Sequence, residues 1–215
     1  MPNSRTYNTP QAAFDRLIDG NKRFVTDTPE HAQQDATRRR ELRTSQLPFS
    51  TLFGCSDSRV AAELIFDVGL GEMFVVRTAG QVTDSVTIGS LEYGVEQLGT
   101  PLVIVLGHDS CGAVTASVDA YQNGTFPGGF VDDVVSNILP AVARAHSQGK
   151  NDIGAAVEQN TVDTVERLYA RSYTIRKAVN EGRTALVGLT YALADGKVNV
   201  VAVRGELNTD SKETQ

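Results

Sequence analysis

The chain has 215 residues, a length that favours one domain and is sufficient for an α/β fold with a sizeable core. Hydrophobic residues make up 40% and charged residues 21% of it, which excludes disordered, collagen-like and coiled-coil proteins. The formal charge of -6 has the wrong sign for a nucleic-acid binder. We therefore expect one domain over residues 1–215 and no nucleic-acid partner.

The apolar runs and the cysteines indicate a compartment. The longest apolar run, Leu102–Leu106, is far shorter than the ~20 residues of a membrane-spanning helix. The segment from Met1 to Gln11 is polar and lacks the apolar core of a secretory signal, so we expect a cytoplasmic protein without membrane contact. Two cysteines do not make a disulfide scaffold, and in a reducing compartment their thiols stay free for a metal or for catalysis.

Residues 1–45 are predicted to form an N-terminal helical arm. Apolar residues from Gln11 to Val25 recur at spacings of three and four, which predicts an amphipathic helix with Pro10 at its first position. Residues 30–46 are polar and favour an exposed helical face or loop over an anion or partner patch, although they contain Arg38, Arg39, Arg40 and Arg43.

Short apolar segments bounded by Gly or Pro are predicted to be buried strands: Ser50–Gly54, Met73–Arg77 and Leu102–Gly107. A helical pattern, Asp84–Leu98, separates the last two, with Asp84 as its N-cap and Gly99 as its stop. This alternation of strand and helix predicts a parallel sheet.

The second half of the chain continues with helical patterns and ends in a hairpin. The expected helices are Ala113–Gln122, Val131–His146 and a long one from Asp152 to about Asn180. The hairpin pairs Thr184–Leu193 with Lys197–Arg204 around the turn signal Asp195–Gly196, and residues 205–215 are expected to be a frayed tail. The predicted fold is therefore α/β: a central, mostly parallel β-sheet with an antiparallel edge strand, flanked by helices.

Both cysteines directly follow predicted strands. Cys55 lies in Gly-Cys-Ser-Asp-Ser-Arg, and Cys111 lies three residues beyond His108 in Gly-His-Asp-Ser-Cys-Gly. Because ligands bind outside the carboxyl ends of parallel strands, both segments can face one crevice. Thiolate and imidazole are strong zinc ligands, and three protein ligands with an open fourth position are typical of catalytic zinc. The alternative is a pair of buried cysteines and a core histidine that follow strands without a metal.

An acidic and a basic residue follow Cys55 closely. Asp57 and Arg59 stand two and four positions after it, and an isolated pair of this kind is usually a salt bridge. Beside a metal, Arg59 can hold Asp57 ionised through bidentate hydrogen bonds, so that Asp57 accepts a proton from metal-bound water. Alternatively, Asp57 can itself take the fourth coordination position.

Cys-x-Asp-x-Arg followed by Gly-His-x-x-Cys-Gly resembles the β-class carbonic anhydrases of bacteria. The resemblance implies reversible hydration of carbon dioxide to bicarbonate and a proton by zinc-bound hydroxide. It implies a homodimer or homotetramer in which the helix from Gln11 to Val25 can be exchanged between subunits. It also implies one Zn²⁺ per chain and a catalytic dyad, with the metal on Cys55, His108 and Cys111 and the dyad formed by Asp57 and Arg59.

The same resemblance implies substrate-binding positions. Gln46 matches a glutamine that donates to the substrate oxygen, and Gly112 offers a backbone N–H beside the last ligand. A small apolar pocket at the dimer seam is implied for Phe74, Ala79 and Tyr93. By composition alone, these three are ordinary core residues.

One departure from the family concerns a regulatory bicarbonate that some bacterial members hold with Trp, Arg and Tyr. Arg77 and Tyr191 match the last two, but Leu52 stands where the tryptophan would be, and the chain contains no Trp. We therefore do not expect bicarbonate regulation there. Closure of the zinc site in acid, with Asp57 leaving Arg59 for the metal, is a hypothesis that their adjacency suggests.

Other functions remain open at this point. A carbonyl sulfide or carbon disulfide hydrolase shares the fold and metal, and a zinc-binding module without turnover would need no Asp57–Arg59 pair. A thiol redox role is weaker, because the two cysteines do not form Cys-x-x-Cys. His31 and His146 lie outside both strand-end segments and receive no role.

Overall fold

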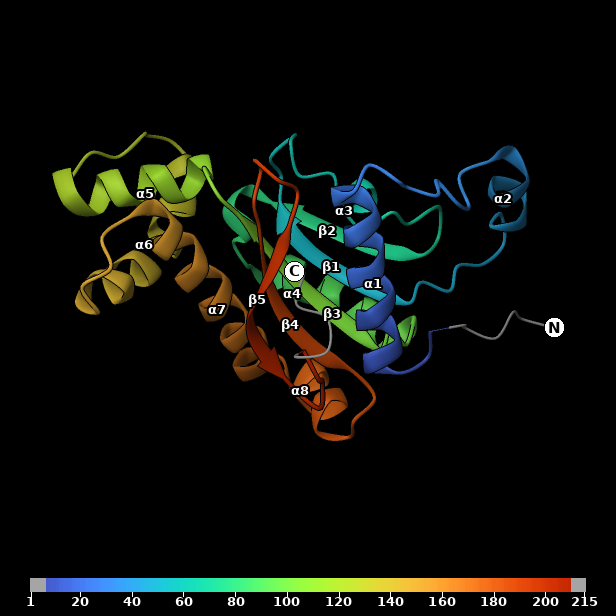
Figure 1. The fold of residues 1–215 in the computed structure, drawn as a ribbon. Coiled ribbons are helices and arrows are strands. Elements are labelled where there is room, and N and C mark those ends of the chain that lie inside the picture. Colours follow the sequence, from blue (N-terminus) through green and yellow to red (C-terminus); the bar gives the residue numbers. More distant parts are fainter. Residues whose placement is uncertain (1–6, 210–215) are drawn as a thin grey trace.

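A five-stranded sheet organises residues 7–209, the part of the chain that this computed structural model describes (Figure 1). The strand order is β2-β1-β3-β4-β5, with β1 to β4 parallel and β5 antiparallel to β4. The strands are β1 (Ser50–Cys55), β2 (Met73–Thr78), β3 (Leu102–His108), β4 (Ala185–Tyr191) and β5 (Val198–Arg204). The predicted fold class, including the antiparallel edge strand, is confirmed.

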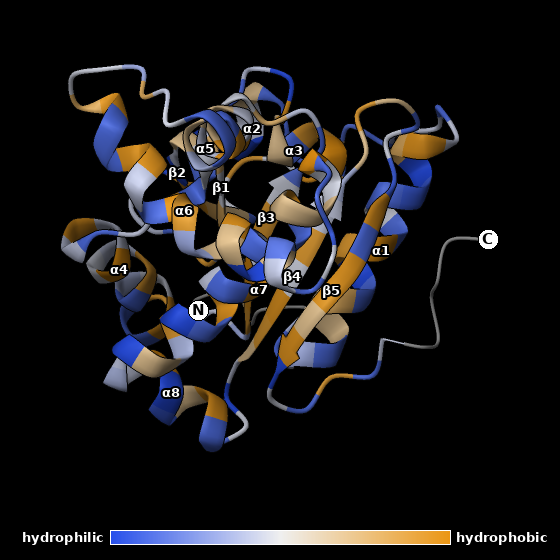
Figure 2. Ribbon diagram, turned by 90° about the vertical axis from the view of Figure 1, so that its left-hand side faces the viewer, coloured by the Kyte–Doolittle hydropathy of each residue, from blue (hydrophilic) through white to orange (hydrophobic). Residues whose placement is uncertain are grey.

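Helices cover both faces of the sheet. They are α1 (Pro10–Val25), α2 (Ala36–Glu41), α3 (Ala62–Ile65), η1 (Ala79–Gln81), α4 (Ser85–Glu92), η2 (Tyr93–Gln97), α5 (Gly112–Asn123), α6 (Val131–Ser147), α7 (Ile153–Arg171) and α8 (Tyr173–Asn180). Figure 2 shows mostly hydrophobic residues along the strands, whereas the surrounding helices carry both hydrophilic and hydrophobic residues. Within the described residues, no helix combines the length and apolar character needed to cross a membrane.

Alternation along the strands divides the core between the two faces. Leu52 and Ile104 join a cluster with α1 and α3, whereas the next residues in each strand, Phe53 and Val105, join one with α4, α7 and α8. A third cluster brings Cys55 and Cys111 together with apolar residues of α5, α6 and α7. The two cysteines therefore lie where the sheet meets these three helices.

The long helix predicted from Asp152 to Asn180 is wrong, because the structure has two helices that meet at Ser172. Ser172 leaves the helical conformation at φ -91° and ψ 111°, and its Oγ accepts a hydrogen bond from the Ile175 N–H, which caps α8. The same hydroxyl donates to Glu92 Oε1 at 2.6 Å. These side-chain bonds replace the helical bonds that the apolar spacing predicted.

Two other boundaries differ from the sequence prediction. The helix predicted over Asp84–Leu98 begins after Asp84 as expected but becomes π-helical at Tyr93. The hairpin is joined by the loop 192–197 rather than by a two-residue turn, because the Ala192 N–H donates to the Lys197 carbonyl at 2.9 Å. Gly196 keeps the left-handed conformation expected of that turn signal, at φ +75°.

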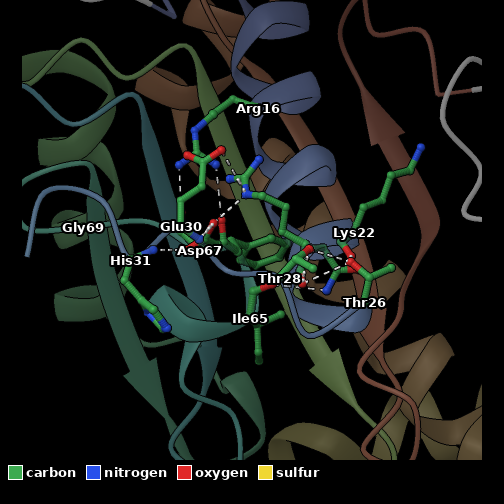
Figure 3. Close-up of polar contacts among 12 residues, drawn as sticks. Arg16, Lys22, Thr26, Thr28, Glu30, His31, Ile65, Asp67 and Gly69 are labelled. Atoms are coloured by element: carbon green, nitrogen blue, oxygen red, sulfur yellow. Dashed lines mark hydrogen bonds and ion pairs between the residues drawn. The ribbon is translucent and has the colours of Figure 1, made fainter.

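The predicted N-terminal arm divides into two parts. The apolar face of α1 is buried against this chain's own sheet, and α2 extends away from the body of the molecule (Figure 1). The end of α1 and the segment that leads to α2 are held by Asp67, which follows α3. Asp67 accepts hydrogen bonds from Arg23 Nε at 2.6 Å, the Glu30 N–H at 3.0 Å and the His31 N–H at 3.1 Å (Figure 3). This buried carboxylate fastens the chain after α1 to the end of α3.

The predicted frayed tail differs from the structure in its described part, residues 205–209. The Asn208 N–H donates to Gln11 Oε1 at 2.8 Å, and Gln11 Nε2 donates back to the Asn208 carbonyl at 3.1 Å. Leu207 packs on the core cluster that contains α1. Residues 210–215 of the predicted tail lie outside the described residues.

Candidate metal centre

The two neighbouring central strands, β1 and β3, end at the candidate site. From β1 the chain crosses to β2 on one side, and β3 then returns on the other side, so the carboxyl ends of β1 and β3 form the switch point of the sheet. Cys55 and His108 are the last residues of these strands, and Cys111 precedes α5. The ligand atoms of Cys55, His108 and Cys111 lie within 4.8 Å of one another.

The histidine ring is oriented by its own backbone. His108 Nδ1 lies 2.7 Å from the Asp109 carbonyl, which accepts the ring proton and leaves Nε2 as the free acceptor. Nε2 is buried and has no hydrogen-bond partner in the described structure, a costly state for a ring nitrogen. Zn²⁺ would give this nitrogen a partner, and two sulfurs with one imidazole nitrogen are a suitable donor set.

The two sulfurs lie in contact with each other. Cys55 Sγ and Cys111 Sγ are 3.9 Å apart and neither cysteine is in a disulfide. The hydrogen bond from Cys111 outweighs burial and lowers the pKa of Cys55 to about 4, while the same contact, together with burial, raises the pKa of Cys111. The lowered pKa of Cys55 favours the thiolate, the form that binds metal.

Arg59 holds Asp57 beside this cluster. Its Nε and Nη2 donate to Asp57 Oδ1 and Oδ2 at 2.9 and 2.7 Å, and its Nη2 also donates to the Ser110 carbonyl at 3.1 Å. Asp57 Oδ2 lies 3.9 Å from His108 Nε2. The hydrogen bonds from Arg59 hold the pKa of Asp57 well below its ordinary range, so the cluster has an ionised carboxylate next to it.

Arg77 braces the end of β1, a role that sequence reasoning missed. Its Nε donates to the Cys55 carbonyl at 2.8 Å and its Nη2 to the Asp57 carbonyl at 2.6 Å. Leu52, at the position of the family's tryptophan, is buried in the same core cluster as Tyr191. The sequence signal for this bracing was only the position of Arg77 on the strand beside β1.

The predicted substrate residues fall into two groups. Ala79 lies in η1 next to Gly80, whose N–H donates a hydrogen bond to Cys55 Sγ, and Gly112 directly follows Cys111. By contrast, Gln46 precedes the amino end of β1 and lines a surface cavity of about 570 Å³ with Arg39, Leu42, Thr44, Ser45, Leu70 and Gly71.

The aromatic pair of that prediction lies on the edge of the sheet. The rings of Phe74 and Tyr93 are 6.0 Å apart, and Tyr93 is 49% exposed. Phe74 pairs with Thr51, near the amino end of β1. Within one chain, Gln46 is therefore not brought to the cysteine cluster, since it precedes the strand that Cys55 ends.

The two histidines without an assigned role stay apart from the cluster. The His31 N–H belongs to the Asp67 contacts, and the His146 ring lies 5.2 Å from the ring of Tyr121. Neither belongs to the group of possible metal ligands.

Fold and site together define an α/β protein with a Cys-His-Cys cluster that could hold a metal ion at the switch point of its sheet. Residues 50–198 match the family model described as "Carbonic anhydrase". The chain belongs to the β-class carbonic anhydrases, a family of enzymes, as its motifs suggested.

Curated relatives match over nearly the whole chain. "Carbonic anhydrase 2" of Mycobacterium tuberculosis is 48% identical over 197 residues, covering 92% of this chain and 93% of that protein. "Carbonic anhydrase" of Mycolicibacterium smegmatis is 46% identical over 207 residues, covering 96% and 98%.

Solved structures share the fold. Tetrameric β-carbonic anhydrases of Sordaria macrospora superimpose with a TM-score of 0.72 at 20% identity, covering 91% of this chain and 100% of that one. The Coccomyxa β-carbonic anhydrase gives a TM-score of 0.71 at 24% identity, covering 88% and 87%.

Proposed function

We propose that the chain catalyses the zinc-dependent, reversible hydration of carbon dioxide to bicarbonate and a proton. The observation that carries the proposal is the group of Cys55, His108 and Cys111, whose ligand atoms lie within 4.8 Å of one another beside the paired Asp57 and Arg59. A site that only held a metal would not need an ionised carboxylate next to the ligands.

In this proposal Cys55, His108 and Cys111 would hold one Zn²⁺, and three protein ligands are typical of catalytic zinc. When bound, zinc supplies Lewis acidity that makes a hydroxide nucleophile available near neutral pH. Asp57 remains ionised because of Arg59, so its oxygens can only accept hydrogen bonds. Asp57 would thus accept a hydrogen bond from the nucleophile. This bond would orient the nucleophile so that a lone pair of its oxygen faces carbon dioxide.

Arg59 holds two parts of this arrangement. Its guanidinium group fixes both oxygens of Asp57, and its further hydrogen bond to the Ser110 carbonyl fixes the turn that leads to Cys111. Ser110 has a left-handed backbone at φ +51°, which a non-glycine residue adopts at a cost. Arg59 therefore ties the dyad to the strained segment that carries a ligand.

The substrate pocket is proposed to combine residues of two subunits. Ala79 and Gly112 border the ligands within one chain, and Gly112 offers a backbone N–H for developing negative charge. Gln46, Phe74 and Tyr93 would complete the pocket at the seam of a homodimer or homotetramer. The tetrameric assembly named for the Sordaria proteins supports this part of the proposal.

The same chemistry supports a cytoplasmic location. Cys55 and Cys111 must stay reduced to bind zinc, and a reducing compartment provides that condition.

The test is stopped-flow hydration of carbon dioxide from about pH 6.5 to 9, on protein with quantified zinc, with Asp57→Asn as the variant. We expect activity that rises with pH in the wild type and falls by about 100-fold or more in the variant. Asp119→Asn, an exposed carboxylate on α5, is the matched control and should keep full activity.

One zinc per chain without hydration at any pH would refute the proposed reaction. Carbonyl sulfide and carbon disulfide would then be the next substrates to assay. Full activity in Asp57→Asn would leave the reaction standing but remove Asp57 from the mechanism.

A further inference from the structure

The turn η1 touches the metal centre through a backbone hydrogen bond. The Gly80 N–H donates to Cys55 Sγ at 3.4 Å. Gly80 has a left-handed backbone at φ +60°, and a Cβ on it would lie 2.6 Å from Ile138 Cδ1 and 2.9 Å from Ala113 Cβ. Only glycine fits between α5 and α6 here, and glycine has no side chain that could fix the turn. The direction of this N–H therefore depends on the other contacts of η1.

The other end of Gly80 is held from α7. Asn160 Nδ2 donates to the Gly80 carbonyl at 3.1 Å, and Asn160 is only 3% exposed. The next residue, Thr161, accepts a hydrogen bond on its Oγ1 from Gln81 Nε2 at 3.4 Å. Two adjacent buried side chains of α7 thus hold two adjacent residues of the turn.

This contact differs from ordinary packing of a polar residue in a core. Gly80 offers its N–H to a proposed metal ligand and its carbonyl to Asn160, so the two bonds fix the peptides on both sides of one Cα. Gln81 is also left-handed, at φ +44°, and such a strained turn keeps its shape only when its surroundings hold it. Loss of the Asn160 bond would leave a buried carbonyl unpaired and free the turn to rotate.

We propose that Asn160 is a positioning residue for the metal centre, acting through Gly80 to hold a hydrogen-bond donor against the Cys55 sulfur. An N–H donor on a thiolate withdraws charge from the sulfur and fixes its direction, which sets how strongly it binds zinc. The metal part of this inference rests on the zinc site of the proposed function. The hydrogen bond from Asn160 to Gly80 joins residues 80 positions apart in the chain, where no sequence motif links them.

The experiment compares Asn160→Leu with the matched control Thr164→Val. Thr164 lies one turn further along α7 and is 1% exposed, and among the described residues its Oγ1 bonds only within the helix, to the Asn160 carbonyl. Asn160→Ser is a second variant, uncharged and smaller, in case the leucine prevents folding. Circular dichroism and thermal unfolding establish that each variant is folded.

Two readouts report on the metal centre without using activity. One is the thiolate-to-cobalt charge-transfer absorption of the Co²⁺-substituted protein, and the other is transfer of Zn²⁺ to a chromophoric chelator. We expect the absorption of the Asn160 variants to move to lower energy, and their zinc affinity to fall about 10- to 100-fold. Thr164→Val should match the wild type in both readouts.

Folded Asn160 variants with wild-type absorption and zinc affinity would overturn the proposal and leave Asn160 as a core residue. Equal changes in Thr164→Val would also overturn it, because the effect would then be general to α7. A wild type that binds neither metal defeats this inference together with the zinc site. A wild type that binds zinc but does not hydrate carbon dioxide refutes only the proposed reaction, since both readouts still apply.

Discussion

Arg59 decides the charge state of Asp57. Its fork is the largest influence on that carboxyl group and lowers the pKa, whereas burial acts to raise it. In Arg59→Gln the effect of burial is opposed less, so the pKa of Asp57 rises. The carboxylate is then protonated, and ceases to accept the hydrogen bond of the nucleophile, at a higher pH than in the wild type. We predict that kcat/KM falls about 100-fold and that its acid limb moves to higher pH.

The measurement is kcat/KM for carbon dioxide hydration from about pH 5.5 to 9. Arg40→Gln on the exposed helix α2 is the control, because the Arg40 side chain hydrogen-bonds only to Thr37 of its own helix within the described chain. An Arg59→Gln profile that is lower but unshifted would mean that Arg59 orients Asp57 without setting its charge.

Among elements, the connection between α1 and α3 depends on Asp67. Burial opposes ionisation of this carboxyl group, but hydrogen bonds from the Glu30 N–H, Arg23 and the His31 N–H outweigh it and lower its pKa. A pKa that is lower in the folded chain stabilises it above the ordinary value of 3.8, and this stabilisation disappears as the pH falls through the lowered pKa. The clamp is therefore present at neutral pH and weakens in acid.

We predict that Asp67→Asn lowers the free energy of unfolding by about 3 kcal/mol at neutral pH, because it leaves the buried side of Arg23 without its charge partner. The difference from the wild type should shrink below about pH 4. Urea unfolding at several pH values measures it. Glu30→Gln, which removes the exposed and longer 3.7 Å ion pair with Arg23, should change stability by less than about 0.5 kcal/mol. A loss for Asp67→Asn that is the same at all pH values would contradict the electrostatic explanation.

The strands, helices and site residues differ in how far the sequence predicts them. The strands were predictable because each is a short apolar run between turn residues, and the parallel order follows from the helices between them. The break at Ser172 was not, because its spacing is helical and its partner Glu92 is 80 positions away. In the candidate site, Cys55 and His108 were placed by the strand ends, whereas Arg77 and Asn160 act through backbone carbonyls that no residue pattern reveals.

In the whole molecule, the edge strand β2 is left partly uncovered when the chain is alone. Every residue of β1 and β3 is buried, but none of β2 is, although Met73, Phe74, Val75 and Val76 are apolar. Strands of a parallel sheet are normally covered on both faces, and an open apolar edge invites pairing. Beside it, Tyr93 is 49% exposed and Val86 is 75% exposed.

We predict that a second copy of the chain covers this edge, so that sedimentation velocity finds a dimer or tetramer at micromolar concentration. Phe74→Glu should dissociate it, because Phe74 contacts the exposed Tyr93 and belongs to none of the core clusters. Val200→Glu is the matched control on β5, the opposite edge of the sheet, where Val200 is 37% exposed. A monomeric wild type, or an intact assembly in Phe74→Glu, would show that β2 is not the interface. Gln46 precedes the strand that Cys55 ends, so without such an interface it would have no route into a catalytic site.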